Sequence, residues 1–183
     1  KRPIIFALAN PNPEIMPDVA RAAVPDAIIA TGRSDFPNQV NNVLCFPFIF
    51  RGALDVGATT INDEMEVACV EGIAALARAT TSAEAAAAYR GEQLTFGADY
   101  LIPKPFDPRL SGVVSTAVAK AAMETGVAER PLDDLKAYKQ KLDASVFKSS
   151  LLMRPVFEAA ATASRRIVFA EGEDERVLRA AQA

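Results

Sequence analysis

The chain has 183 residues, half of them hydrophobic and 23% charged, with a formal net charge of −3. This length fits one domain, or one domain with a piece of another, and the composition supports a packed core. The sequence has no histidine, no Gly-x-Gly-x-x-Gly and no Walker A loop, so it lacks the commonest metal ligand and two common phosphate-binding fingerprints. The acidic balance argues against a nucleic-acid binder, and no apolar run approaches the ~20 residues that span a membrane.

The first part of the chain predicts a βαβ unit. Residues 4–8 and 27–30 are short apolar runs typical of buried parallel strands. Between them we expect Asn12 to cap a helix that has Pro13 at its first position and continues over residues 18–24. This order of elements favours parallel pairing. Residues 31–42 are polar and aperiodic, which predicts a loop of a length that is often functional.

The rest of the chain is largely helical in pattern. After an apolar segment at 46–56, Thr60 and Asp63 resemble a capping box before a helix whose apolar residues repeat every three or four positions over 61–76. Further helices are predicted at 82–89, at 107–126 after an irregular proline-rich stretch, from Asp133 or Asp134 to about 146, and at 149–164. A strand at 166–170 and a helix from 174 complete the pattern.

The two cysteines, Cys45 and Cys69, are too few for a disulfide framework or a four-thiolate zinc site. Reduced, buried thiols in a cytoplasmic protein are the simpler interpretation. No signal peptide is recognisable, because Lys1-Arg2 precedes only a short apolar run. The sequence begins without methionine directly before a strand-like run, so we expect it to be part of a longer protein.

Asparagine side chains follow the carboxyl ends of both predicted strands. Asn10 follows the first strand, and Asn38, Asn41 and Asn42 follow the second. Ligands of open parallel sheets bind beyond these strand ends, and amides can donate to a carboxylate or carbonyl at any pH. The pattern suits a small, polar, anionic ligand. The alternative is turn chemistry: Asn10 and Asn12 would close Asn-Pro turns, and Asn41 or Asn42 would cap the next helix.

Charged side chains give weaker candidates. Lys104, Arg33 and Arg51 are candidate anion contacts, although exposed loop charges explain them more simply. Asp63 and Glu64 suit the positive end of a helix dipole, and no acidic cluster has spacing diagnostic of a metal site.

Several segments closely resemble bacterial malic enzymes of the NADP type. They are FALANPNPE (6–14), ATGRSDFPNQVNNVLCFP (30–47), IFRGALDV (49–56) and FGADYLIPKPFDPRL (96–110), and the resemblance covers about residues 1–146. The segment RIVFAEGEDERVL (166–178) resembles the opening strand and helix of a phosphotransacetylase. The combination resembles a known hybrid of the two enzymes.

The resemblance implies an α/β fold in three parts. Residues 1–126 would be the C-terminal part of a Rossmann-like NADP-binding domain with parallel strands and helices. Residues 127–165 would be a helical end segment and connector. Residues 166–183 would be the first strand and helix of a second α/β domain. With no sheet to join, 166–183 is expected to be disordered or to pair with another chain.

The resemblance also implies an activity. The family oxidises (S)-malate to pyruvate and CO₂ with NADP and Mg²⁺ or Mn²⁺. Asn10 and Asn41 match asparagines that contact malate and the nicotinamide, and Asn42 is a weaker match. The family's catalytic Lys and Tyr and its metal ligands would lie upstream, so no catalytic or metal residue is assigned here, and Lys104 and Tyr100 do not match that pair.

Partners follow from the same resemblance. The parent protein would bind malate and pyruvate, form a homo-oligomer and sense acetyl-CoA through the appended domain. The isolated chain is expected to be inactive. The alternative is a non-catalytic module that serves only oligomerisation or interdomain contacts.

Overall fold

The computed structural model describes residues 2–79, 94–163, 168, 170, 172–174 and 177–178. The chain divides into two compact units, residues 1–146 and 147–183. The predicted helix at 82–89 lies outside the described residues, as do most of the predicted strand at 166–170 and most of the helix from 174.

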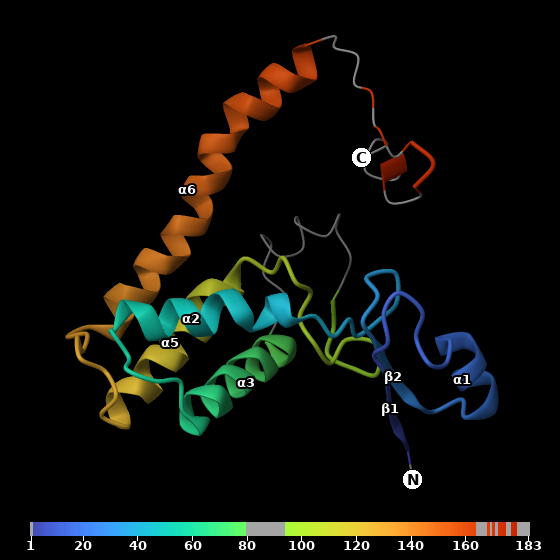
Figure 1. The fold of residues 1–183 in the computed structure, drawn as a ribbon, viewed down its shortest axis with the longest axis horizontal. Helices are drawn as coiled ribbons and strands as arrows, with labels where there is room; N and C mark the ends of the chain where they lie inside the picture. Colours follow the sequence, from blue (N-terminus) through green and yellow to red (C-terminus); the bar gives the residue numbers. More distant parts are fainter. Residues whose placement is uncertain are drawn as a thin grey trace. The chain divides into compact units, whose positions relative to one another are not determined.

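A small parallel sheet forms the N-terminal part of the first unit. Strand β1 (Ile4–Ala7) pairs with β2 (Ile28–Thr31), and helix α1 (Pro17–Ala23) connects them (Figure 1). Ala7 lies opposite Thr31, so both strands end at the same edge. The predicted βαβ unit with parallel strands is confirmed.

The start of α1 differs from the prediction. The helix begins at Pro17, four residues later than expected, and its N-cap position is Met16. Pro13 and Pro17 are both suited to the first turn of a helix, and α1 begins at Pro17. Glu14 instead accepts a hydrogen bond from the Ala9 backbone N–H at 3.1 Å, which closes the turn after β1. The predicted cap at Asn12 is therefore wrong.

The two strands are buried to different degrees. In β2, Ile29 and Ala30 are almost fully buried, and Ile29 forms a small apolar cluster with Ala20 of α1 and Ala27. In β1, Ile4 and Phe6 are 59% and 64% exposed. The prediction of a buried strand holds for β2 and is wrong for β1, because neighbouring side chains alternate between faces and only one face of β1 is covered.

A helical core forms the rest of the first unit. It comprises η1 (Asn42–Leu44, a 3₁₀ turn), α2 (Phe46–Asp55), α3 (Asp63–Arg78), α5 (Arg109–Glu124) and the start of α6 (Leu135–Thr162). Helix α5 packs on both α2 and α3 (Figure 1). The buried side chains include Val56, Met65, Cys69, Leu110, Val114, Val118 and Leu142.

Close packing between α2 and α5 depends on a glycine. A Cβ atom added to Gly52 would lie 2.5 Å from the Ser115 carbonyl oxygen and 2.9 Å from the Val118 Cβ. The Ser115 hydroxyl also donates to the Phe48 carbonyl at 3.1 Å. The missing side chain therefore allows the two backbones to approach closely.

Most predicted helices are confirmed, with two corrections. The cap of α3 is Asn62, whose side chain accepts from the Met65 N–H at 3.1 Å, so the predicted Thr60–Asp63 capping box is wrong. The helices predicted before 146 and after 149 form the single helix α6, because no Gly or Pro interrupts residues 135–154. At the start of α6, Asp134 is the cap, and its carboxylate accepts from the Lys136 and Ala137 N–H groups.

The helix predicted from Asp107-Pro108 is confirmed within one residue. Its first residue is Arg109, and the Asp107 carboxylate accepts from the Arg109 N–H at 2.9 Å. Gly126, with a φ of 73°, follows the end of the helix as predicted. None of the described helices is both long enough and apolar enough to cross a membrane.

Candidate functional site

The carboxyl edge of the small sheet positions the candidate asparagines. Ala7 and Thr31 end the two paired strands, and Asn10 lies three residues beyond Ala7. The chain after β2 then returns to this edge, because the Val40 N–H donates to the Thr31 carbonyl at 2.8 Å. Asn41 follows Val40 directly. Each candidate segment is therefore attached to the edge at which open parallel sheets bind ligands.

Asn41 is both a cap and a candidate donor. Its side-chain oxygen accepts from the Val43 N–H at 3.0 Å and caps η1, so the cap interpretation is confirmed for this residue. The cap fixes the orientation of the half-buried carboxamide. Its NH₂ group makes no hydrogen bond to the described residues, so two N–H donors remain available to a ligand.

Asn10 and Asn42 are exposed. Asn10 precedes a cis peptide bond to Pro11, and Asn42 is the first residue of η1, where its carbonyl accepts from the Cys45 N–H. Within the described part of the chain, no hydrogen bond joins Asn10 to Asn41 or Asn42. The structure thus places the three candidates on two segments that leave the same sheet edge, with Asn41 and Asn42 adjacent in the chain and Asn10 on the other segment.

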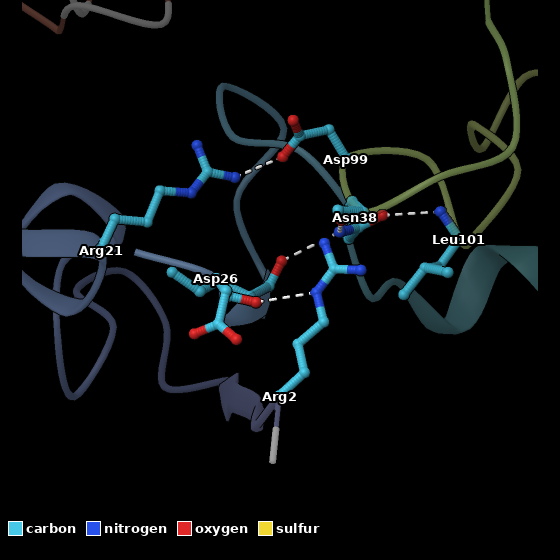
Figure 2. Close-up of polar contacts among 8 residues, drawn as sticks. Arg2, Arg21, Asp26, Asn38, Asp99 and Leu101 are labelled. Carbon is cyan, nitrogen blue, oxygen red and sulfur yellow. Dashed lines mark hydrogen bonds and ion pairs between the residues drawn. The ribbon is translucent and has the colours of Figure 1, made fainter. Parts of the chain in front are cut away.

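Asn38 has a structural role instead. It is 5% exposed with a φ of 53°, and its amide donates to the Ile29 and Ala98 carbonyls at 3.0 and 2.7 Å. Its side-chain oxygen accepts from the Leu101 N–H at 2.8 Å (Figure 2). Its polar groups are therefore committed to joining β2 to the segment 94–106.

Two arginine contacts surround this junction. Arg21 of α1 forms an ion pair with Asp99, and the Arg2 side chain donates to the Asp26 carbonyl at 2.8 Å (Figure 2). Together with Asn38, the Arg21 pair fixes the proline-rich segment against the sheet.

A cavity of about 760 Å³ lies between the loop after β2 and the proline-rich segment. Its lining contains Asn38 and Lys104 and lacks Asn10, Asn41 and Asn42. The cavity also borders Tyr100, whose buried hydroxyl has no hydrogen-bond partner among the described residues. Burial raises the pKa of Tyr100, and the nearby Asp107 raises it further. Of the candidate asparagines, this cavity therefore includes only Asn38, whose polar groups are already bonded within the chain.

The candidate basic residues Arg33 and Arg51 are each paired with a carboxylate. Arg33 makes two hydrogen bonds to Asp35, at 2.8 and 2.6 Å, and Arg51 contacts Asp55 at 2.6 Å. The Asp55 hydrogen bond raises the pKa of Arg51. Their charges are therefore already compensated within the chain.

The acidic residues of α3 fit the helix-dipole interpretation. Asp63, Glu64 and Glu66 lie in the first turn of α3. In the part of the chain that the structure describes, no three His, Cys, Asp or Glu side chains are grouped so as to hold a metal ion. The described residues therefore do not fit a Mg²⁺ or Mn²⁺ site.

Comparison with known proteins connects this geometry to a family. Residues 1–89 match the family model for the malic enzyme NAD-binding domain. Over these residues the chain is therefore similar to a malic enzyme NAD-binding domain. Residues 151–183 match the model for phosphate acetyl/butaryl transferases. The α/β fold class predicted from the sequence is confirmed.

Curated relatives extend the similarity over the whole chain. The chain is 66% identical to an NAD-dependent malic enzyme of Rhizobium meliloti over 183 residues, and 59% identical to an NADP-dependent malic enzyme of Escherichia coli over 182 residues. In each case the match covers 100% of this chain and 24% of the relative. The chain therefore spans about a quarter of the length of these relatives.

Solved structures agree with this similarity. The malic enzyme of Pyrococcus horikoshii has a TM-score of 0.62 and 37% identity, with 86% of this chain and 31% of that chain covered. The Entamoeba histolytica malic enzyme has a TM-score of 0.66 and 34% identity, with 85% and 30% covered. The match to the NAD-binding domain model supports a nicotinamide cofactor. The roles of Asn10, Asn41 and Asn42 stay predictions.

Proposed function

We propose that this chain supplies one wall of the active site of a malic enzyme, which converts (S)-malate to pyruvate and CO₂ and reduces NADP. The observation that carries the proposal is the Asn41 carboxamide, which its cap holds at the carboxyl edge of the sheet and whose N–H groups bond to none of the described residues. The similarity to proteins named malic enzymes supports the substrate.

A bound NADP would supply the acceptor for the hydride that malate loses. The role of this chain is to position ligands by hydrogen bonding. Asn41 donates to a malate carboxylate or to the nicotinamide carboxamide, and Asn10 makes a similar contact from the end of β1. Asn42 is exposed and contributes less. The catalytic Lys and Tyr and the ligands of Mg²⁺ or Mn²⁺ are assigned to other parts of the parent protein.

NADP is proposed as the preferred cofactor. The relatives from Haemophilus influenzae and Escherichia coli, 62% and 59% identical, are named NADP-dependent, whereas the 66% identical relative from Rhizobium meliloti is named NAD-dependent. Assays with both cofactors test this choice.

The parent is further proposed to be a cytoplasmic hybrid enzyme. In this proposal residues 1–126 complete the cofactor domain and residues 166–183 begin a phosphotransacetylase-like domain. Residues 127–165 form the helical connector between the two domains. The transferase match over 151–183 supports the last part. Such a parent forms a homo-oligomer and senses acetyl-CoA through the appended domain.

A segment exchange tests the proposal. The matching quarter of the Escherichia coli NADP-dependent malic enzyme is replaced by this chain, and malate-dependent NADP reduction is measured in the presence of Mg²⁺. The chimera is expected to be active, and the 183-residue chain alone inactive. In the chimera, Asn41→Ala should lower kcat/KM for malate roughly 10- to 100-fold, the effect of losing a hydrogen bond to a charged group.

Asn42→Ala is the matched control, because it removes a neighbouring exposed carboxamide and should change kcat/KM by less than about threefold. If Asn10→Ala and Asn41→Ala both leave the kinetics of an active chimera unchanged, the assigned site is wrong and the assembly-module alternative is favoured. If a folded chimera is inactive, the proposed function itself is contradicted.

A further inference from the structure

The two cysteines meet across the helical core. Cys69 lies in the middle of α3 and is 1% exposed, whereas Cys45 lies between η1 and α2 and is half-buried. The Cys69 thiol donates to the Cys45 sulfur at a distance of 3.3 Å. A disulfide bond is about 2.05 Å long, so the sulfurs must approach by about 1.3 Å to form one. Small rotamer and backbone shifts supply movements of this size.

The position of Cys45 gives such a bond a consequence. Cys45 ends η1, and its backbone N–H donates to the Asn42 carbonyl at 3.1 Å. Its own carbonyl accepts from the Phe48 and Ile49 N–H groups in the first turn of α2. A displacement of Cys45 toward α3 would therefore also move η1, the turn that Asn41 caps.

We propose that Cys45 and Cys69 form a dithiol site that hydrogen peroxide converts, in the folded chain, to an intrachain disulfide which shifts η1. The proposal goes beyond the proposed function, because it holds whether or not the chain contributes to malate oxidation. It also differs from the structural role expected for two buried, reduced thiols.

The chemistry balances in two steps. The Cys45 thiolate attacks one peroxide oxygen, the O–O bond breaks, and the departing hydroxide takes up a proton to give water and a sulfenic acid on Cys45. The Cys69 sulfur then attacks the Cys45 sulfur, the S–O bond breaks, and the hydroxyl leaves as water with the Cys69 proton. The dithiol loses two electrons and the peroxide gains them.

Exposure determines the order of the steps. Cys45 is the thiol that solvent reaches, whereas burial, followed by the contact with Cys45, raises the pKa of Cys69 to about 12. Cys69 therefore stays protonated near neutral pH and acts second, when the sulfenic acid is already in contact with it.

The test uses the reduced 183-residue chain, treated with hydrogen peroxide near neutral pH and then alkylated under denaturing conditions. The expected product has no alkylatable thiol, a mass about 2 Da below that of the reduced chain, and a non-reducing peptide that links residues 45 and 69. Dithiothreitol should restore both thiols. Retention of both thiols, an intermolecular Cys45 disulfide, or a sulfinic acid at Cys45 with Cys69 still free would overturn the proposal.

Two variants serve as controls. Cys69→Ala should leave Cys45 as a sulfenic acid that dimedone traps, and Cys45→Ser should leave Cys69 unmodified because it is buried. Amide hydrogen exchange of the oxidised wild-type chain tests the structural consequence, and the rates at Val43 and Cys45 are expected to change at least about threefold. A disulfide without such a change would overturn the proposed shift of η1.

Discussion

The helical part and the strand part of the first unit differ in how they bury their apolar residues. The helices enclose Met65, Leu110 and Val114, all at 0% exposure, within a core built from four helices. The strands share only a small cluster under α1 and leave Ile4 and Phe6 exposed. Because hydrophobic burial is the main stabilising contribution to folding, the helical part is expected to hold most of the stability.

The part of the chain with the larger core is not the part that holds the candidate ligand contacts. The candidate asparagines follow the strands, and η1 connects them to the helical core through Cys45 and α2. The segment that would contact a ligand is therefore anchored on one side by a large core and on the other by a small sheet. Substitutions should affect the two parts unequally.

The largest expected effect comes from breaking the helical core at Gly52. Gly52→Ala places a methyl group 2.5 Å from the Ser115 carbonyl oxygen, so α2 and α5 must separate. The free energy of unfolding should fall by about 2–3 kcal/mol, as for other overpacked cores. Urea denaturation followed by circular dichroism measures this change.

Gly72→Ala is the matched control for this substitution. Gly72 is also a helical glycine at a helix contact, but its added Cβ would meet Val113 and Val114 at an ordinary 3.7 Å. Alanine favours the helix by up to ~1 kcal/mol, so this variant should be as stable as the wild type or more stable. Equal losses in both variants would contradict the account of α2–α5 packing.

A second substitution addresses the strand part. Asn38→Ala removes three hydrogen bonds, one buried and two part-buried, that join β2 to the segment 94–106. The unfolding free energy should fall by about 2 kcal/mol, because backbone groups lose buried partners. Amide exchange at Leu101 should accelerate, while exchange within α3 and α5 should change much less.

Asn42→Ala provides the comparison for Asn38, since Asn42 is exposed and makes no side-chain hydrogen bond to the described residues. Its effect should stay within about 0.5 kcal/mol. If Asn38→Ala proves equally mild, the amide does not hold the two segments together.

A smaller effect is expected at the contact between α2 and α6. The Tyr138 hydroxyl donates to Asp55 at 2.8 Å, so Tyr138→Phe should cost about 1 kcal/mol at neutral pH. Burial, then the Asp55 hydrogen bond, raises the pKa of Tyr138 above its ordinary value of 10.0.

This pKa shift predicts a pH dependence. Above pH 10 the unfolded tyrosine loses its proton while the folded one keeps it, so the contribution of Tyr138 to stability is complete below pH 10 and declines as the pH rises further. The stability gap between wild type and Tyr138→Phe should therefore narrow above pH 10 in urea titrations. If the stability difference between wild type and Tyr138→Phe instead widens with pH, the pKa of Tyr138 is not raised by folding.

The smallest effect is expected at an exposed ion pair. Lys120 and Glu124 on α5 lie 3.6 Å apart with side chains 57% and 65% exposed. Lys120→Met should change the free energy of unfolding by less than about 0.5 kcal/mol. Added salt should remove this difference between the variant and the wild type. A loss comparable to that of Gly52→Ala would mean that surface charge contributes as much as core packing.

Local patterns predicted much of the fold. The apolar runs at 4–8 and 27–30 and the periodicity of 61–76 identified β1, β2 and α3, because side-chain spacing reports which face is buried. Gly126 marked the end of α5, because glycine readily adopts the left-handed backbone conformation that follows a helix. Cap identities were less certain, since Thr60, Asn62 and Asp63 are all competent caps and tertiary contacts select among them.

Long-range contacts were not predictable in this way. Tyr138 and Asp55 are 83 residues apart, and Cys45 and Cys69 are 24 apart, with no local signal that they meet. The exposed face of β1 was likewise missed, because an apolar run does not say what covers it. For the site, strand ends predicted where Asn10 and Asn41 lie, but nothing local separated the buried Asn38 from its exposed neighbours.

Native-state amide hydrogen exchange on the 183-residue chain tests the central structural claim most directly. That claim is that the helical part has a large core, whereas the strands that precede the candidate asparagines share only a small apolar cluster. Amides of Cys69, Val114 and Val118 should exchange only through global unfolding, and those of Ile29 and Ala30 should open with a free energy lower by at least about 1–2 kcal/mol. Equal protection in both parts would contradict the claim.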